Sequence, residues 1–399
     1  MRLPPLLLLT ALFLADGVMA QDETFSQCLG RIQGLARQQE IPEWIVQDVV
    51  AKFEYQARVI ELDRKQPEFI QTFEQYYKAR VTDQRVQRGR QLYAEHLNLL
   101  AQLTRQYGIP GQYLVAFWGL ETNFGSYLGN MPTLDSLATL ACDDRRSQFF
   151  TDELLIALKL MVREKLPVER LRGSWAGAMG HVQFMPSTYQ QYAVDGDNDG
   201  LIDLWQSRQD ALSSAANYLH KSGWRRGERW GREVLLPTSF PYSEAELSNP
   251  QPLSYWRRLG VLQANGAPLP DMALPASIIL PMGHSGPAFV AYQNFQVIMR
   301  WNRSQSYALA VGNLADQIAG GQGLKASVFK PAPVLSRSLI TQLQTALAGR
   351  GYAVGEADGV IGPATRAALR EYQSSNGLIA DGFPDLSTLL ALGLDGITQ

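Results

Sequence analysis

The sequence predicts a mainly α-helical protein that ends in a small three-helix module. Apolar residues recur at helical spacing between about residue 41 and residue 164, whereas the alternation typical of strands is hard to find before about residue 275. A segment that contains Pro331 and Pro333, residues 324–334, then separates a short C-terminal part from the rest. We therefore expect one large helical domain, a linker and a small helical module.

Length and composition exclude several classes of protein. A chain of 399 residues corresponds to two or three domains. A hydrophobic share of 46% with 19% charged residues excludes disordered and fibrous proteins. The net charge of −2, from 36 basic and 38 acidic side chains, gives no electrostatic basis for binding nucleic acid. Two cysteines are too few for a Cys-rich zinc module, and the four histidines lack His-x-x-x-His spacing.

Residues 1–20 have the features of a cleaved signal peptide. Arg2 provides the positive charge, residues 6–14 form a short apolar run, and Ala20 ends a small-residue cleavage site. The apolar run is too short to span a membrane, and Gln21 stands where a lipoprotein would need cysteine. We therefore expect an exported, soluble protein without a membrane anchor.

Export places the two cysteines in an oxidising compartment. A lone pair in such a compartment usually forms a bridge, so we expect a disulfide between Cys28 and Cys142. The alternative is two separate cysteines that each act as a small buried apolar residue.

Helices are predicted in order along the large domain. One begins near Pro42, a residue suited to a first turn, and a second covers residues 88–107. Residues 108–110, Gly-Ile-Pro, end that helix, and a strongly apolar helix follows through residues 113–121. Another helix is predicted over residues 152–164.

The C-terminal module, residues 335–395, contains a weak internal repeat. Residues 357–369 and 380–392 each place an Asp-Gly turn before a short amphipathic helix. With a helix over residues 339–347, the repeat predicts three short helices. A unit of this size is a module and not an enzyme.

Glu121 is the candidate general acid. The seven residues before it are uncharged and mostly large and apolar, so desolvation should favour its protonated form and raise its pKa. Cleavage of a glycosidic bond needs such an acid, because the leaving oxygen must receive a proton. The alternative is a partly exposed glutamate at a helix end.

Two further segments have a composition suited to a saccharide cleft. Residues 173–186 are rich in small residues and contain Ser174 and Gln183, whose uncharged polar groups can bond amides and hydroxyls. Aromatic residues that could stack on sugars follow later in the chain. Each of these could equally be an ordinary core residue. They are Tyr218, Trp224, Trp230, Trp301 and Tyr307.

These residues carry a resemblance to a known family. The strings WGLETNFG, SWAGAMGHVQFMPSTY and AANYL, together with an acidic loop after residue 194, resemble the lytic murein transglycosylases of the B type. The resemblance covers about residues 25–318. It implies a lysozyme-like catalytic domain with extra helices over residues 21–323, and cleavage of the β-1,4 bond between N-acetylmuramic acid and N-acetylglucosamine in the periplasm.

The resemblance also implies roles for individual residues. Glu121 matches the single catalytic acid and base of the family. Trp301 stands where the family commonly has tyrosine, which keeps an aromatic platform, removes a hydroxyl and leaves a hydrogen-bonding role open. The matching residues along the glycan cleft are Ser174, Gln183, Phe184, Tyr218, Trp301 and Tyr307, with Arg145 and Arg146 as a cationic pair beside it.

A single carboxylate implies a non-hydrolytic reaction without a catalytic cofactor. Glu121 would first protonate the glycosidic oxygen and then deprotonate the C6 hydroxyl, which attacks C1 to give a 1,6-anhydro end. One alternative is a hydrolytic muramidase, which needs a second carboxylate that the motifs do not provide. The other is a non-catalytic scaffold that only binds peptidoglycan.

The acidic loop at residues 195–210 resembles an EF-hand. Its alternating oxygen donors and its central Gly200 suit Ca²⁺. Gln206 replaces the usual glutamate at position twelve, and Asp210 is its substitute. The predicted ligands of a structural Ca²⁺ are Asp195, Asp197, Asp199, Leu201 and Asp210. The alternative is a solvated acidic turn.

The C-terminal module is similar to the helical peptidoglycan-binding domains of cell-wall enzymes, through DGVIGPATRAALREYQ. Together the two resemblances imply peptidoglycan glycan strands as the partner. They leave other cell-wall enzymes open as further partners, and they indicate neither nucleic acid nor a membrane anchor.

Overall fold

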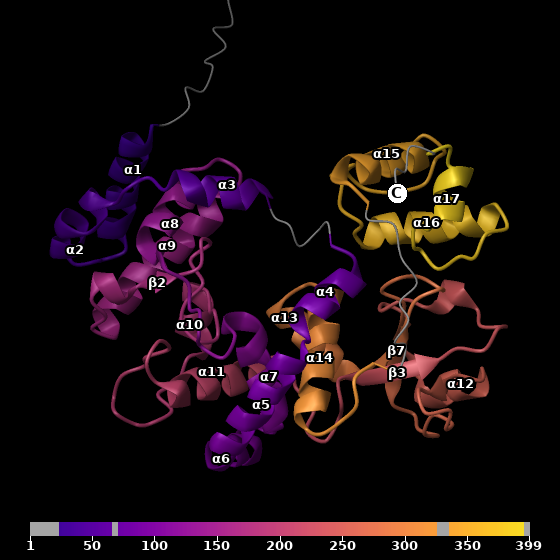
Figure 1. The fold of residues 1–399 in the computed structure, drawn as a ribbon. Helices are drawn as coiled ribbons and strands as arrows, with labels where there is room; N and C mark the ends of the chain where they lie inside the picture. Colours follow the sequence, from indigo (N-terminus) through magenta and orange to yellow (C-terminus); the bar gives the residue numbers. More distant parts are fainter. Residues whose placement is uncertain (1–23, 66–70, 325–334, 395–399) are drawn as a thin grey trace, which may run out of the picture.

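The computed structural model describes residues 24–65, 71–324 and 335–394, and its mainly helical fold confirms the predicted class (Figure 1). The predicted signal peptide and residues 325–334 of the predicted linker lie outside the described residues. Within the described ranges, no helix has the length and apolar character that crossing a bilayer requires.

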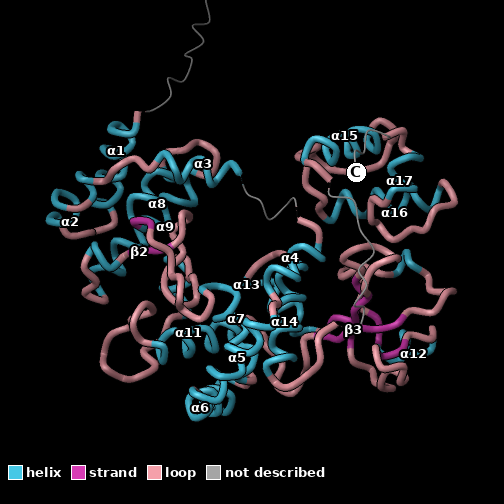
Figure 2. The backbone as a smooth tube through the Cα atoms, viewed as in Figure 1, coloured by secondary structure: helices cyan, strands magenta, loops and turns pink. Residues whose placement is uncertain are grey.

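The elements form an arc (Figures 1 and 2). The helices are α1 (Phe25–Gln38), α2 (Glu43–Asp48), α3 (Ala57–Lys65), α4 (Phe73–Arg80), α5 (Asp83–Glu95), α6 (Leu97–Tyr107), α7 (Gly111–Thr122), α8 (Thr133–Ala141), α9 (Ser147–Arg163), α10 (Pro186–Tyr192), α11 (Arg208–Lys221), α12 (Leu253–Arg258), α13 (Gln293–Trp301), α14 (Gln305–Ile318), α15 (Arg337–Ala348), α16 (Pro363–Ser375) and α17 (Leu386–Ala391), with short 3₁₀ helices at Val50–Lys52, Val168–Arg170 and Tyr242–Glu244. The strands are β1 (Met131–Pro132), β2 (Arg172–Gly173), β3 (Gly231–Leu235), β4 (Gln251–Pro252), β5 (Leu262–Gln263), β6 (Pro275–Ile279) and β7 (Ala288–Ala291). The arc has α1–α3 and α8–α10 at one end, α4–α7, α13 and α14 in the middle, and the strands β3 and β7 with α12 and α15–α17 at the other end (Figures 1 and 2).

Helix α7 lies in the middle of the largest hydrophobic core. All residues from Tyr113 to Gly119 are buried, as expected of a helix that is apolar around its whole circumference. It packs against α5, α6, α11 and α14. Because Glu121 is in its last turn, this packing fixes the position of the candidate acid.

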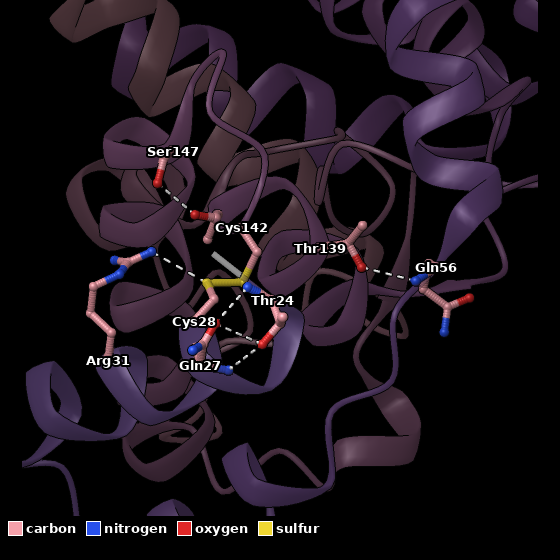
Figure 3. The surroundings of a disulfide bond; sticks show 9 residues. Thr24, Gln27, Cys28, Arg31, Gln56, Thr139, Cys142 and Ser147 are labelled. Carbon is pink, nitrogen blue, oxygen red and sulfur yellow. Dashed lines mark hydrogen bonds between the residues drawn. A yellow bond between two sulfur atoms is a disulfide. The ribbon is translucent and has the colours of Figure 1, made fainter. Parts of the chain in front are cut away.

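The predicted disulfide is confirmed. Cys28 of α1 is bonded to Cys142, the residue that caps the C-terminal end of α8 (Figure 3). Thr24 and Gln27 form a capping box at the start of α1, and Arg31 donates a hydrogen bond to Cys28 Sγ. The bridge therefore joins the first helix to α8 across 114 residues of sequence.

The structure contains a five-stranded antiparallel sheet, in the order β4-β6-β7-β3-β5, that was not predicted from the sequence. The expectation that strand signals begin near residue 275 is wrong for β3, which pairs with β7 from Gly231↔Ala291 to Val234↔Ala288. The signal is weak because the strands have two to five residues and because β7 is buried at every position, without alternation. Helix α13 follows β7 directly, so the sheet orients the helix that carries Trp301.

Two helix boundaries also differ from the predictions. The helix expected over residues 88–107 is divided at His96, which ends α5 and precedes α6. Apolar residues continue through the break because both helices pack on the same core, so spacing alone does not reveal it. The helix expected over residues 152–164 starts earlier, at Ser147.

The C-terminal module is the predicted three-helix unit, and its repeat is structural. In the first half the Gln344 amide donates to Asp358 Oδ1 and Thr365 Oγ1, at 3.0 and 3.2 Å. In the second half the Gln373 amide donates to an Asp-Gly turn and a threonine in the same way, at 3.2 and 3.0 Å. A separate hydrophobic cluster forms the centre of this module.

Candidate active site

The side chain of Glu121 lies where α7, α13 and α14 meet. Trp301 Nε1, from the end of α13, donates a hydrogen bond of 2.9 Å to Glu121 Oε1. The hydroxyl of Tyr307, from the first turn of α14, donates to the same oxygen. Within the described residues, Oε2 has no such protein donor. The two carboxyl oxygens therefore differ, because Oε1 accepts both hydrogen bonds and Oε2 remains available to a substrate.

Burial raises the pKa of Glu121 to about 7, from an ordinary value of 4.5. The hydrogen bonds from Tyr307 and Trp301 and the positive charge of Arg80 act in the opposite direction. The carboxyl group is therefore close to half protonated at neutral pH. Such a group can donate a proton and later accept one, which is the requirement for a single acid and base.

Aromatic rings form a continuous wall beside Glu121. The Trp301 ring lies between those of Phe117, Phe184 and Tyr218, with centroid distances of 4.5, 5.3 and 5.0 Å. Tyr192 stacks edge-on against Tyr218, and the Tyr218 hydroxyl donates to the backbone oxygen of Arg300. Tilted and edge-to-face packing of this kind fixes ring orientations. Phe117 and Phe184 are buried, whereas Tyr192, Tyr218 and Trp301 are partly exposed and form the accessible part of the wall.

A tight turn after α7 supports this arrangement. Asn123, Phe124 and Gly125 all have positive φ angles, of 48°, 60° and 78°. A Cβ atom on Gly125 would lie 2.2 Å from the His181 ring, so glycine is required for both conformation and space. Trp118 Nε1 donates to His181 Nδ1, and burial lowers the pKa of His181 to about 4. His181 is thus a neutral acceptor that supports the turn.

The small-residue segment, residues 173–186, is a folded loop joined to the end of α7, because Thr122 Oγ1 donates a hydrogen bond to the backbone oxygen of His181. Ser174 Oγ accepts a hydrogen bond from the Ala178 amide, which closes the loop. Gln183, at a φ of 50°, donates its amide to the backbone oxygens of Leu128 and Gly180. Strained backbone at a polar residue often accompanies a functional site. Ser174 and Gln183 are therefore held in fixed orientations, while Phe184 contributes its ring to the aromatic wall.

Arg145 and Arg146 are paired with a carboxylate of α3. Both form ion pairs with Asp63 of α3, a nearly fully buried carboxylate, and Arg146 also lies over the Phe150 ring. Among the described residues, none of their contacts reaches the Glu121 cluster. The two ion pairs with Asp63 therefore connect α3 to the segment before α9.

The acidic loop brings some of its predicted ligands together. Carboxylate oxygens of Asp195, Asp197 and Asp210 lie within 4.8 Å of one another, so a single cation could contact all three. Asp210 is almost fully buried in the first turn of α11, and burial raises its pKa. Asp199 lies outside this cluster and accepts a hydrogen bond from the Leu201 amide. The donor set of grouped carboxylates fits Ca²⁺.

Sequence reasoning missed some neighbours of the site. Arg80, at the end of α4, is 41 positions before Glu121 and follows no recognisable motif, yet its charge acts on that carboxyl group. Tyr192 ends α10 and belongs to the aromatic wall. The hydrogen bond from Trp301, left open by its departure from tyrosine, is present because the indole N–H replaces a hydroxyl donor.

Comparison with known proteins places these features in a family. Residues 24–316 match the family described as Transglycosylase SLT domain, and residues 336–392 match the Putative peptidoglycan binding domain. The chain belongs to the lytic transglycosylases. It is 34% identical to Membrane-bound lytic murein transglycosylase B of Escherichia coli (strain K12) over 257 residues, which are 61% of this chain and 66% of that protein.

Two solved structures extend the comparison for this lytic transglycosylase. SltB3 from Pseudomonas aeruginosa, in complex with NAG-anhNAM-pentapeptide, is 42% identical with a TM-score of 0.89, and the match covers 93% of this chain and all of that one. Slt35 from Escherichia coli, in complex with calcium, is 28% identical with a TM-score of 0.64, and the match covers 76% of this chain and 97% of that one. The likeness therefore includes the C-terminal module for SltB3.

Proposed function

We propose that this lytic transglycosylase cleaves the β-1,4 bond between N-acetylmuramic acid and N-acetylglucosamine and leaves a 1,6-anhydro end, with Glu121 as its one acid and base. The supporting observation is a carboxyl group with a pKa of about 7. In the described part of the chain, neither its hydrogen bonds nor the main charges acting on it involve a second carboxylate. A hydrolytic mechanism with two acids has no second member here.

The reaction begins with protonation of the leaving oxygen. The bond between C1 and the glycosidic oxygen breaks as that oxygen takes the proton from Glu121 Oε2, while Oε1 stays held by Trp301 and Tyr307. These two neutral donors stabilise the carboxylate that forms. The partly exposed rings of Tyr218 and Trp301 would contact the sugar faces during this step, and the buried Phe184 ring would support them from the core.

The second step restores the enzyme. Ionised Glu121 takes the proton of the C6 hydroxyl on the muramoyl residue, and O6 attacks C1 to close the anhydro ring. An internal nucleophile has a large advantage over water because it is already in place. The proton balance closes on Glu121, so the cycle consumes no water.

We assign Ser174 and Gln183 to the glycan cleft through their fixed polar groups, and Trp301 and Tyr307 to both the cleft and the acid. Arg145 and Arg146 remain proposed glycan contacts on the strength of the family resemblance. Their ion pairs with Asp63 support a structural role as well.

Analysis of products by mass spectrometry tests the proposal. Purified peptidoglycan incubated with the enzyme should release fragments one water lighter than hydrolytic products, and Glu121→Gln should lower the rate by roughly a thousandfold. Reducing-end products would establish a muramidase instead. Binding to peptidoglycan without any release of fragments would establish a scaffold.

We propose that residues 335–395 hold the enzyme on its substrate. The match to a peptidoglycan-binding family over residues 336–392 supports this role. A weak binding module linked to an enzyme raises the local concentration of substrate. Removal of this module should reduce cleavage of whole sacculi much more than cleavage of short soluble glycan fragments.

We infer a periplasmic location from the residues of the predicted signal peptide and from the disulfide, which requires an oxidising compartment. Cell fractionation tests it. The full chain should appear in the periplasmic fraction, and a chain without residues 1–20 should not.

We propose that Asp195, Asp197 and Asp210, with Asp199 and the Leu201 carbonyl, hold a structural Ca²⁺. The grouped carboxylates support it, and the related Slt35 was crystallised with calcium. Bound Ca²⁺ would neutralise the like charges and fix the loop before α11. In calorimetry, Ca²⁺ should raise the melting temperature of the wild type by a few degrees. The control Asp144→Ala should show the same rise, and the melting temperature of Asp197→Ala should not respond to Ca²⁺. Equal melting of the wild type with and without Ca²⁺ would contradict the proposal.

A further inference from the structure

A cavity of about 870 Å³ lies between the catalytic part and the C-terminal module. Its walls come from the start of α4, the end of β6, the segment between α13 and α14, and the start of α16. Much of this wall is apolar, through residues such as Phe73, Leu280, Met282 and Ile361. This volume is within the range of protein sites that bind small ligands.

The charged groups around the cavity are unevenly paired. Asp381 is bonded to the amide of His284 at 2.8 Å, and Arg370 forms an ion pair with Glu246 at 3.4 Å. Arg303 and Arg366 also line the cavity. Among the described residues, neither of these two guanidinium groups has a hydrogen-bond or ion-pair partner.

Arg366 is partly exposed at the cavity wall and is acted on by charges of both signs. Burial and the neighbouring charge of Arg370 lower the pKa of Arg366 to about 10, the negative charge of Asp381 acts in the opposite direction, and the group stays charged at neutral pH. Asp381 Oδ2 is already bonded to His284, so an anion in the cavity would supply the hydrogen bonds that the Arg366 guanidinium group lacks among the described residues. The cavity therefore fits an anionic ligand with apolar parts.

The cavity wall includes residues next to those of the candidate active site, although Glu121 and its two hydrogen-bond donors do not line the cavity. Arg303 lies two residues after Trp301, and Ser304, which caps α14, lies between Arg303 and Tyr307. Trp175, next to Ser174 of the glycan cleft, is also part of the cavity wall. A side arm on a glycan bound at Glu121 would therefore extend into this space.

We propose that the cavity binds the carboxylate-bearing peptide arm of the glycan substrate, with Arg303 and Arg366 as the two carboxylate ligands. The inference rests on the proposed function. The related SltB3 was crystallised with a glycan fragment that bears a pentapeptide, and a peptide with a free C-terminus carries a carboxylate. Guanidinium groups bind carboxylates through paired hydrogen bonds, and the apolar wall provides contacts for the peptide side chains.

A comparison of two substrates tests this site in the full-length enzyme. One substrate is glycan strands with intact peptides, and the other is the same strands from which the peptides have been removed. The readout is the ratio of kcat/KM for the two substrates. We expect Arg366→Gln and Arg303→Gln each to lower this ratio about tenfold. Arg366→Lys keeps the charge but loses the paired donors of the guanidinium group. Its ratio should therefore lie between those of the wild type and Arg366→Gln.

Arg258→Gln is the matched control. Arg258 is exposed on α12, outside the cavity, and among the described residues its side chain forms no hydrogen bond or ion pair. Its ratio should equal that of the wild type. Equal losses on both substrates in Arg366→Gln, or an unchanged ratio in both cavity variants, would overturn the proposal. Absence of cleavage by the wild type would instead overturn the proposed function.

A binding measurement separates the carboxylate from the sugar. Calorimetry would compare a disaccharide pentapeptide with the same compound whose carboxylates are converted to amides. The free acid should bind about tenfold more tightly than the amide to the wild type, this difference should be smaller in Arg366→Gln, and it should be absent in the double variant Arg303→Gln/Arg366→Gln. Equal affinity of both compounds for the wild type would refute recognition of the carboxylate.

Discussion

At the scale of single residues, the raised pKa of Glu121 couples catalysis to stability. Its pKa is 4.5 ordinarily and about 7 in the fold, so the folded state binds the proton more tightly than the unfolded one. The neutral group is favourable below pH 4.5, and this contribution is lost as the pH rises towards 7. Glutamine mimics the neutral form at every pH.

Glu121→Gln should therefore raise the free energy of unfolding by up to about 3 kcal/mol above pH 7, with no gain near pH 4. Calorimetry over this pH range measures the effect. Glu371→Gln, at an exposed glutamate of α16, is the surface control and should change the free energy of unfolding by less than about 0.5 kcal/mol. A gain that is equal at both ends of the range would contradict the raised pKa.

The hydroxyl of Tyr307 should set the alkaline limit of activity. Its hydrogen bond stabilises ionised Glu121, so Tyr307→Phe should raise the pKa of Glu121 further. In a plot of kcat against pH, the alkaline limb should therefore move to higher pH. We also expect kcat to fall about tenfold, because the same bond stabilises the carboxylate formed in the reaction.

Tyr218→Phe distinguishes this effect from loss of a ring hydroxyl in general. The Tyr218 hydroxyl donates to a backbone oxygen and not to Glu121. This variant should leave the alkaline limb in place, whatever its effect on KM. A limb that moves equally in both variants would refute the assignment.

The sequence predicted residues of the site where they belong to a contiguous string. Glu121, Ser174 and Gln183 stand in such strings, and the apolar residues before Glu121 gave the cause of its raised pKa. Arg80 was not predictable, because its proximity depends on how α4 packs. The unpaired state of Arg366 likewise depends on how two cores meet.

At the scale of elements, the disulfide secures the first helix. Helix α1 contributes Cys28, Ile32 and Ala36 to the core, and the bridge closes a loop across 114 residues. The double variant Cys28→Ala/Cys142→Ala should lose about 4 kcal/mol of unfolding free energy, because the unfolded chain gains entropy. Urea unfolding measures this loss, and reductant should lower the wild type by a similar amount. Identical midpoints would show that packing alone holds α1.

Helices were easier to predict than strands for a physical reason. A helix such as α7 or α9 extends its pattern over three or more turns, whereas β1, β2, β4 and β5 have two residues each. Strands this short depend on their partners for stability, and partners are distant in sequence. The His96 break shows the same limit, because periodicity reports burial and not the continuity of hydrogen bonds.

At the scale of the whole molecule, the repeat in the C-terminal module has two Asp-Gly turns with different roles. The carboxylate of Asp381, in the second turn, is bonded to both the backbone amide and the ring of His284. His284 lies in the segment between β6 and β7. Asp358 in the first turn accepts hydrogen bonds from Gln344 and Val360 of its own module. One copy of the motif thus fixes the module against the sheet, which shapes the cavity.

Close approach at Gly283 makes this contact sensitive to a single atom. Gly283 has a φ of 69°, and a Cβ atom there would lie 2.8 Å from both Asp381 Oδ2 and Phe383 Cβ. Gly283→Ala should therefore separate the module from the sheet and increase the radius of gyration in small-angle X-ray scattering. Gly266→Ala has a similar backbone strain, at a φ of 84°, with no atom within 4 Å of the added Cβ, so it should keep the wild-type radius.

Separation should also abolish the preference for peptide-bearing strands, because Arg366 would leave the cavity while Arg303 stays. An unchanged radius with a lost preference would mean that the glycine affects the peptide directly, and an unchanged preference after separation would mean that the module and the catalytic part recognise the substrate independently.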